Sequence, residues 1–261
     1  MGKSPHGKAR PYGALFNPHR RLLLTAGAAL LLAPAAIAAP GAPGEQPTTI
    51  VVVGDSQAQG VAGALQRLYV RDRKHYHVLD RSRIGTGLIT RPDFNWPEEA
   101  KDLASERHMD IAVIMFGAND RPPFHLDDVD PGLKERFQRA YGKHVRDIVK
   151  SFRDVGAEVI WLGHPVVRDS RYTADMAFLN QIYQQNATEA GAHWLPLWDL
   201  VTDSNGGYAA YGKGVDGEKR RLRADDGVHF TPAGYDLVVN RLRPLIEEHH
   251  AMLSSGATPG R

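Results

Sequence analysis

Cysteine is absent from the 261-residue sequence. Its absence excludes a disulfide framework, a thiolate nucleophile and any metal site built from cysteines. Histidines do not replace it, because the pairs His75/His77 and His249/His250 lack a third ligand at a spacing typical of metal sites. We therefore expect these histidines to lie on the surface, the fold to depend on its apolar core, and the protein to need no metal or other cofactor.

Acidic residues are missing from the first 44 positions, where five Lys and Arg residues accompany an apolar run over residues 22–38. The run ends in Ala36-Ile37-Ala38, a small-x-small cleavage site. We predict a signal peptide over 1–38 and an exported protein, periplasmic or secreted, with no stable membrane span after cleavage. Arg20-Arg21 resembles a twin-arginine signal, but His19 stands where Ser or Thr is usual, so an ordinary secretory signal remains open.

A strong charge of one sign is also missing. The formal net charge is +2, and removal of the leader leaves 27 basic against 30 acidic side chains. A domain this close to neutrality lacks the basic surface that binds nucleic acid, so we predict no nucleic-acid partner.

The remaining chain alternates strand-like and helix-like segments behind a Pro/Gly-rich tether over 39–47. The alternation predicts an α/β domain with a parallel sheet over 48–250, followed by a flexible tail over 251–261. The expected strands cover 48–53, 77–80, 111–116, 158–163 and 193–197, and the expected helices 57–69, 96–106, 132–155, 172–190 and 232–250. Ligands of such sheets bind at the carboxyl ends of the strands, so the residues that follow the strands are the candidates for a site.

Ser56 follows the first of these strands in Gly54-Asp55-Ser56. Its position at a strand-to-helix junction places it at or near the N-cap, beside unpaired backbone N–H groups. Ser56 is therefore either a helix cap or a serine nucleophile, and the second role requires a base within reach.

A base and its acidic partner occur together near the C-terminus, in Asp226-Gly227-Val228-His229. Residues three apart on a tight turn can face one another, so Asp226 can hold one imidazole nitrogen while the other faces Ser56. Asp225 is one residue out of phase for this contact. The alternative is an ordinary turn with a half-buried histidine.

An acyl-serine mechanism also needs donors for the oxyanion. Ser56 can supply its own N–H, Gly85 a backbone N–H that no Cβ obstructs, and Asn119 a side-chain amide. Gly87 is an alternative to Gly85. Each glycine also fits an ordinary turn, and Asn119 also fits an Asx turn.

The segments around Ser56, Gly85, Asn119 and His229 form four sequence blocks, and together they resemble those of the SGNH branch of the GDSL hydrolases. The signature residues correspond to Ser56 in Gly-Asp-Ser, Gly85 in the second block, Asn119 in Gly-Ala-Asn-Asp, and His229 in Asp-Gly-Val-His. A finer resemblance is to an exported bacterial subgroup with Gly-Ala-Asn-Asp-Arg in the third block. Gln57 departs from the pattern, since many relatives have an apolar residue after the serine.

The resemblance implies a three-layer α/β/α fold with strand order 2-1-3-4-5, and acyl-ester chemistry without a metal. We therefore expect an exported esterase that removes acyl groups, specifically acetyl, from a carbohydrate or another small ester. Two alternatives remain. One is an envelope glycan O-acetyltransferase, with an acyltransferase partner, that uses the same acyl-serine; the other is a carbohydrate-binding domain with an inactive catalytic set.

Arg121 and Arg168 each follow a strand at the predicted active edge, where either can bind a carboxylate or hydroxyl of substrate or tie loops together. The long connection over 202–225 offers Tyr208 and Tyr211 as platforms for a sugar, and its glycines predict a mobile cover. Its basic residues, from Lys213 onward, are typical of a solvated loop face.

Overall fold

The computed structural model describes residues 46–89 and 94–256. The predicted signal peptide, including its arginine pair, and most of the predicted tether lie outside these residues. No helix in the two described ranges is long and apolar enough to cross a membrane.

The described chain alternates strands and helices and adds a small hairpin before its last helix. In chain order the elements are β1 (Thr48–Gly54), α1 (Ser56–Leu68), β2 (Tyr76–Ser82), α2 (Trp96–Glu106), β3 (Ile111–Met115), α3 (Pro131–Asp154), β4 (Glu158–Leu162), α4 (Ser170–Glu189), β5 (His193–Leu195), β6 (Tyr211–Lys213), β7 (Lys219–Arg221) and α5 (Pro232–Ser254).

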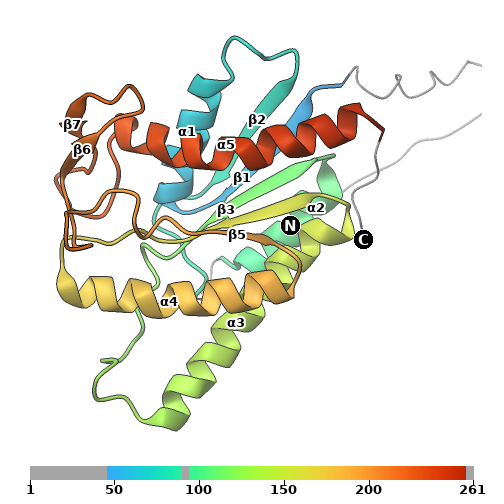
Figure 1. Ribbon diagram of the computed structural model, residues 1–261. Coiled ribbons are helices and arrows are strands. Elements are labelled where there is room, and N and C mark those ends of the chain that lie inside the picture. The colour runs from blue at the N-terminus through green and yellow to red at the C-terminus, as the bar shows by residue number, and fades with distance from the viewer. Residues whose placement is uncertain (1–45, 90–93, 257–261) are drawn as a thin grey trace, which may run out of the picture. The chain divides into compact units, whose positions relative to one another are not determined.

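Five of the strands form one parallel sheet in the order β2-β1-β3-β4-β5. Alternate residues of β1 enter different cores: Ile50 and Val52 pack with α1 and α5, whereas Val51 and Val53 pack with α2, α3 and α4. Figure 1 shows the resulting three layers, with the sheet between the two groups of helices. The predicted fold class and strand order are confirmed.

Every predicted boundary of these strands and helices except the end of α5 lies within two residues of the observed one, and two of the differences have clear reasons. β5 ends at Leu195 rather than at residue 197, because Pro196 lacks the N–H that a further ladder bond needs. Helix α5 continues to Ser254, four residues past its predicted end, because Ala251, Met252 and Leu253 are good helix formers. Residues 251–254 therefore belong to a helix and not to the predicted tail.

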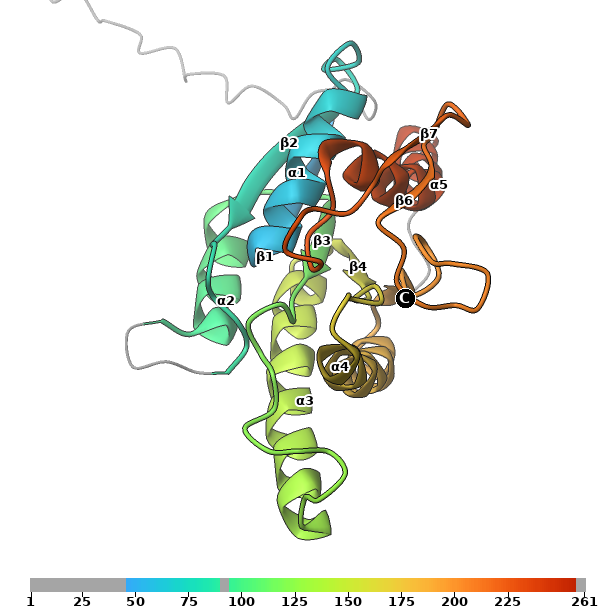
Figure 2. The ribbon, with the colours of Figure 1, turned by 90° about the vertical axis from the view of Figure 1, so that its left-hand side faces the viewer.

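The long connection over 202–225, predicted as a mobile cover, contains secondary structure that the sequence analysis did not predict. Thr202 and Tyr208 form a β-bridge, and β6 and β7 pair in antiparallel register from Tyr211/Arg221 to Lys213/Lys219. In Figure 2 this hairpin lies beside α5. The glycines serve turns within it, since Gly206 and Gly217 both have positive φ.

Candidate active site

The first strand-to-helix junction places Ser56 at the start of α1. Asp55, not Ser56, is the N-cap residue, and its carboxylate accepts a hydrogen bond of 2.8 Å from the backbone N–H of Gln57. The capping role expected as the alternative for Ser56 is therefore taken by its neighbour, which leaves the Ser56 hydroxyl to contact another group.

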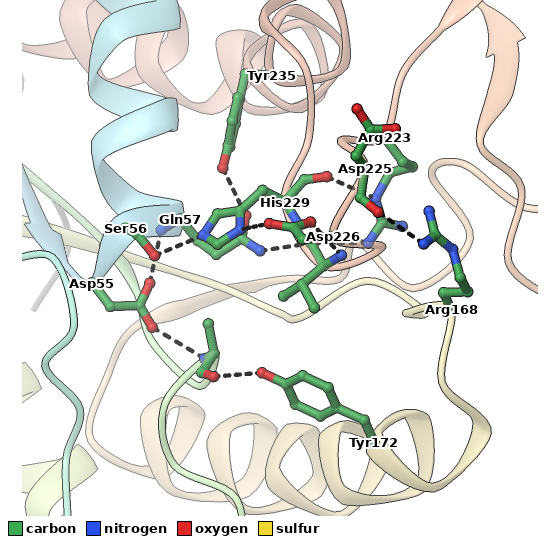
Figure 3. A network of polar contacts seen from close by, with 12 residues as sticks. Asp55, Ser56, Gln57, Arg168, Tyr172, Arg223, Asp225, Asp226, His229 and Tyr235 are labelled. Carbon is green, nitrogen blue, oxygen red and sulfur yellow. Dashed lines mark hydrogen bonds and ion pairs between the residues drawn. The ribbon is translucent and has the colours of Figure 1, made fainter.

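That group is the imidazole of His229 (Figure 3). Ser56 Oγ lies 2.7 Å from His229 Nε2, and His229 Nδ1 lies 2.6 Å from Asp226 Oδ2. In the arrangement that a serine nucleophile requires, the hydroxyl donates to Nε2 and the Nδ1–H donates to the carboxylate. The predicted Ser56, His229 and Asp226 are thus brought together in one chain of hydrogen bonds, although they come from opposite ends of the domain.

Asp225 does not compete with Asp226 for the imidazole. Its carboxylate pairs with Arg221, and its side chain is 90% exposed. Asp226 also accepts hydrogen bonds from the backbone N–H groups of Val228 and His229, at 2.8 and 2.9 Å. The turn itself thus selects which carboxylate faces the ring.

These contacts determine the charge of Asp226. Burial acts to raise the pKa of its carboxyl, but the backbone N–H groups of Val228 and His229 and the imidazole outweigh this and lower it. Asp226 is therefore ionised at neutral pH and can stabilise the imidazolium that forms when His229 takes a proton.

Gly227 allows this turn to lie against the loop after β4. Its φ is +75°, and an added Cβ would lie 2.6 Å from Cβ of Arg168. The carbonyl of Gly227 accepts a hydrogen bond of 3.0 Å from the backbone N–H of Arg168. A larger residue at this position would push the turn over Asp226 to His229 away from its support.

The second and third sequence blocks meet beside the serine. Asn119 is exposed in the turn after β3, and its side-chain amide donates one hydrogen bond, of 2.8 Å, to the carbonyl of Thr86. An amide nitrogen carries two donors, so a second N–H is left for a substrate oxygen. Thr86 lies between Gly85 and Gly87, and this contact therefore brings both predicted donor positions to one place.

The two glycines have different surroundings. Gly85 has φ of +75° and is exposed, with nothing within 4 Å of an added Cβ. At Gly87 an added Cβ would lie 2.0 Å from Oδ1 of Asp120. Gly87 is explained by this close approach to a buried carboxylate, whereas no neighbouring atom explains Gly85, which therefore stays the candidate oxyanion donor.

Three buried polar residues around the triad were not assigned a role from the sequence. Asp55, which is completely buried, also accepts a 3.1 Å hydrogen bond from the backbone N–H of Ala118 and so joins the first block to the third. Burial raises the pKa of its carboxyl to about 7. The other two residues, Gln57 and Arg223, support the turn that carries His229.

Gln57 connects α1 to that turn. Its amide donates to the carbonyl of Val228 at 2.9 Å, and its side-chain oxygen accepts from the hydroxyl of Tyr235 at 2.8 Å. The sequence held a signal for this role, since an amide follows the serine where an apolar residue is usual. Figure 3 shows Gln57 beside the imidazole of His229, with the hydroxyl of Tyr235 pointing down toward it.

Arg223 is fully buried behind the same turn. Its guanidinium donates to the carbonyls of Val166 at 2.6 Å and Val228 at 2.9 Å, and packs over the rings of Phe230 and Tyr208. Burial lowers its pKa to about 10. Nothing in the sequence distinguished it from the exposed basic residues that precede it.

The two arginines predicted to bind substrate differ in what they contact. Arg168 donates to the carbonyl of Asp225 at 2.8 Å, lies over the ring of Tyr208 and supports, through its backbone, the turn that carries His229. Arg121 donates through Nε to Asp175 and lies over Tyr172. Tyr208 is therefore covered by arginines, and only Tyr211, which is 56% exposed, remains open as a platform.

The histidine pairs lie away from these residues. His75 and His77 are exposed as predicted, but His249 is 3% exposed and burial lowers its pKa, so the prediction of a surface residue was wrong. His249 continues the three- to four-residue spacing of the buried residues of α5, so its side chain faces the core. In the described ranges, no group of three or more His, Cys, Asp or Glu side chains is arranged to hold a metal ion.

Comparison with solved structures shows the same fold in proteins of low sequence identity. A protein from Slackia heliotrinireducens assigned to the SGNH hydrolases is 19% identical, with a TM-score of 0.52 over 76% of this chain and 98% of its own. The periplasmic domain of a lipopolysaccharide acetyltransferase from Salmonella ser. Paratyphi A is 15% identical, with a TM-score of 0.50 over 78% and 85%. A variant of Axe2, an acetyl-xylooligosaccharide esterase from Geobacillus, is 16% identical, with a TM-score of 0.50 over 78% and 97%.

These likenesses confirm the SGNH hydrolase fold. No curated protein sequence matches this chain. A family model does match over residues 49–244, a range that contains Ser56, Asn119 and the Asp226–His229 turn. The chain therefore belongs to the family described as protein of unknown function (DUF459).

Proposed function

We propose that this protein is a serine esterase that hydrolyses acyl esters, specifically acetyl esters of a carbohydrate or another small alcohol. The observation that carries the proposal is the chain of hydrogen bonds from Ser56 through His229 to Asp226, with lengths of 2.7 and 2.6 Å. A merely structural serine needs no imidazole oriented by a carboxylate, so this geometry argues against an inactive binding domain.

The first half-reaction transfers the acyl group to the enzyme. His229 Nε2 takes the hydroxyl proton as Ser56 Oγ attacks the ester carbonyl, and the oxyanion accepts hydrogen bonds from Ser56 N–H, Gly85 N–H and the free amide N–H of Asn119. When the tetrahedral intermediate collapses, the bond to the alcohol oxygen breaks and His229 returns its proton to that oxygen. The alcohol leaves and an acyl-serine remains.

The second half-reaction releases the acid. His229 removes a proton from water as the water oxygen attacks the acyl-serine, and the bond to Ser56 Oγ breaks as Oγ recovers the proton. Hydrolysis is favoured over transfer because the site is open to water: Asn119 is exposed, and the side chains of His229 and Asp226 are 32% and 48% exposed.

A dedicated acetyltransferase would have to orient a sugar hydroxyl better than water at the same acyl-serine. The covered ring of Tyr208 removes one of the two platforms that the loop over 202–225 offered. The related folds include both an acetyl-xylooligosaccharide esterase and a lipopolysaccharide acetyltransferase domain, and both names support acetyl as the acyl group. The leader-like N-terminal sequence supports a periplasmic or secreted location.

The test is hydrolysis of p-nitrophenyl acetate, butyrate and octanoate and of an acetylated oligosaccharide by the purified domain. We expect the acetate to be the best of the nitrophenyl esters and Ser56→Ala to abolish release of free acid. Adding an unacetylated oligosaccharide should change the products little. Ester cleavage that survives Ser56→Ala would refute the serine mechanism, and predominant formation of acetylated acceptor would replace the esterase by a transferase.

A further inference from the structure

A cavity of about 400 Å³ opens between the segment after Asn119 and helix α4. Its charged lining consists of Arg121, Arg171 and Asp175, and the ring of His125 completes one side. The segment that forms one wall continues directly from the turn that carries Asn119, so the lining of the cavity begins two residues after Asn119 in the chain.

Arg121 is held in a fixed position at the near end of this cavity. Its Nε donates to Asp175 Oδ2 at 2.7 Å, and the Asp175 side chain is only 7% exposed. The guanidinium carbon lies 4.9 Å from the ring centre of Tyr172, whose hydroxyl donates to the carbonyl of Ala118. Figure 3 shows Tyr172 reaching from α4 toward this segment. Two side chains of α4, Asp175 and Tyr172, therefore fix the position and orientation of the Arg121 head group.

The terminal nitrogens of Arg121 remain available. Among the described residues, neither Nη atom has a hydrogen-bond partner, and 45% of the side chain is exposed. An arginine with both Nη groups directed outward offers two parallel donors to a carboxylate or phosphate. Arg168 does not offer the same site, because its Nη groups already contact the carbonyl of Asp225 and the hydroxyl of Tyr208.

The charge of the cavity favours an anion. Arg121 and Arg171 contribute two positive charges against the single carboxylate of Asp175, which is already paired. Two further carboxylates, Asp127 and Asp128, line a neighbouring cavity beyond His125. An anion is therefore favoured at the Arg121 end, close to Asn119, and disfavoured farther along the groove.

Asn119 and Arg121 lie two residues apart in one loop, so their Cα atoms are at most about 7 Å apart. Their side chains leave this loop toward different elements, Asn119 toward Thr86 after β2 and Arg121 toward Asp175 on α4. An ester held at Asn119 must therefore extend across the loop to bring an anionic substituent to the guanidinium.

We propose that Arg121 binds an anionic group, a carboxylate or a phosphate, on the sugar that carries the ester or on its neighbour. The preferred substrates are then O-acetylated acidic sugars and not neutral ones. This inference rests on the proposed esterase function, and it identifies Arg121 as a specificity residue that leaves the chemistry at Ser56 unchanged.

The kinetic test compares three substrates: an O-acetylated methyl glucoside, the corresponding methyl glucuronide, and an O-acetylated glucose phosphate. We expect kcat/KM to be about 10- to 100-fold higher for one or both anionic esters, as a charge-assisted bidentate contact provides. The carboxylate and phosphate arms show which anion is preferred. Equal kcat/KM for all three substrates would overturn the proposal.

The variants must not leave Asp175 buried without its partner. We therefore combine Arg121→Gln with Asp175→Asn, and add Arg121→Lys, which keeps the ion pair but not the two parallel donors. Both should retain the kcat/KM for the neutral ester and lose most of the preference for anionic esters. The matched control is Arg67→Gln, which removes an exposed, ion-paired arginine at the far end of α1.

A binding measurement separates this inference from the esterase function. Methyl glucuronide and glucose phosphate, both without acetyl groups, are titrated into Ser56→Ala protein and followed by NMR, with methyl glucoside as the neutral comparison. We expect the anionic sugars to bind at least tenfold more tightly, and the double variant in the Ser56→Ala background to lose this difference. Binding without any esterase activity would refute the proposed function alone, whereas activity without charge preference would refute the anionic site alone.

Discussion

Replacement of Arg223 tests whether the position of His229 depends on the cation buried behind its turn. The guanidinium donates to the carbonyl of Val166 at 2.6 Å and to that of Val228 at 2.9 Å, with a longer contact of 3.4 Å to the carbonyl of His229 itself. It thereby joins the loop after β4 to the catalytic turn. In Arg223→Gln a single amide can satisfy at most part of this set.

The expected loss follows from these contacts. Hydrogen bonds to a charged donor contribute about 1.5–3 kcal/mol each, so the two short bonds correspond to about 3–6 kcal/mol. Burial of the guanidinium, which lowers its pKa to about 10, offsets part of this. We expect Arg223→Gln to lower the free energy of unfolding by about 2–4 kcal/mol. We also expect kcat/KM to fall by about 10- to 100-fold, because small displacements of a catalytic base are costly.

The assay is hydrolysis of p-nitrophenyl acetate at a temperature where the variant is folded, together with thermal unfolding. Arg223→Lys keeps the charge but cannot reach both carbonyls, so its kcat should lie between those of the wild type and Arg223→Gln, with little change in KM. Arg220→Gln is the matched control, since it removes an exposed arginine that pairs with Asp216. An Arg223→Gln enzyme that is less stable but has normal kcat would show that the cation supports the fold and not the base.

Three further outcomes are expected from the proposed site. Asn119→Ala should lower kcat by about 10²- to 10³-fold with an unchanged melting temperature, and normal turnover would show that Asn119 only shapes a turn. Asp226→Asn should reduce the rate by about 10³-fold or more, while Asp225→Asn should leave it unchanged. Since burial raises the pKa of Asp55 to about 7, the folded state keeps a proton that the unfolded state releases above its ordinary value of 3.8, so wild-type stability should fall as pH rises through this window. The melting temperature of Asp55→Asn relative to that of the wild type should therefore rise between about pH 4 and pH 7 and stay constant above pH 7. A difference in melting temperature that does not change with pH would contradict a protonated Asp55 carboxyl.

The sequence predicted the sheet well because the signals for it are local. The run Thr49 to Val53 is β-branched throughout, and its two sets of alternating residues enter the two cores as a parallel, doubly covered strand requires. Helix starts were equally readable: Thr231 caps α5 with Pro232 in its first turn. The largest displacement is at the end of α5, where the sequence contains no residue that breaks the helix, and β5 ends early because Pro196 lacks an N–H.

The supports of the site were not predictable in the same way, because they connect residues far apart in the chain. Arg223 meets Val166 across 57 residues, and Gln57 meets Val228 across 171. Periodicity and turn chemistry carry no information about such pairs. The hairpin within the loop over 202–225 was missed for a related reason, since the pairing of β6 with β7 joins two short segments that carry no strand pattern of their own.

Asp55 of the first block and Asp120 of the third explain how the loops after β1, β2 and β3 come to share one site. Asp55 accepts a hydrogen bond from the backbone N–H of Ala118 and so holds the third block against the first. Asp120 accepts hydrogen bonds of 2.7 and 3.0 Å from the backbone N–H groups of Leu88 and Ile89 and so holds the second block against the third. Each carboxyl group is buried and directed at the backbone of another block. Gly87 must be glycine because Asp120 approaches it so closely. These carboxylates therefore position the groups that surround Ser56, and we assign proton transfer at the site to His229.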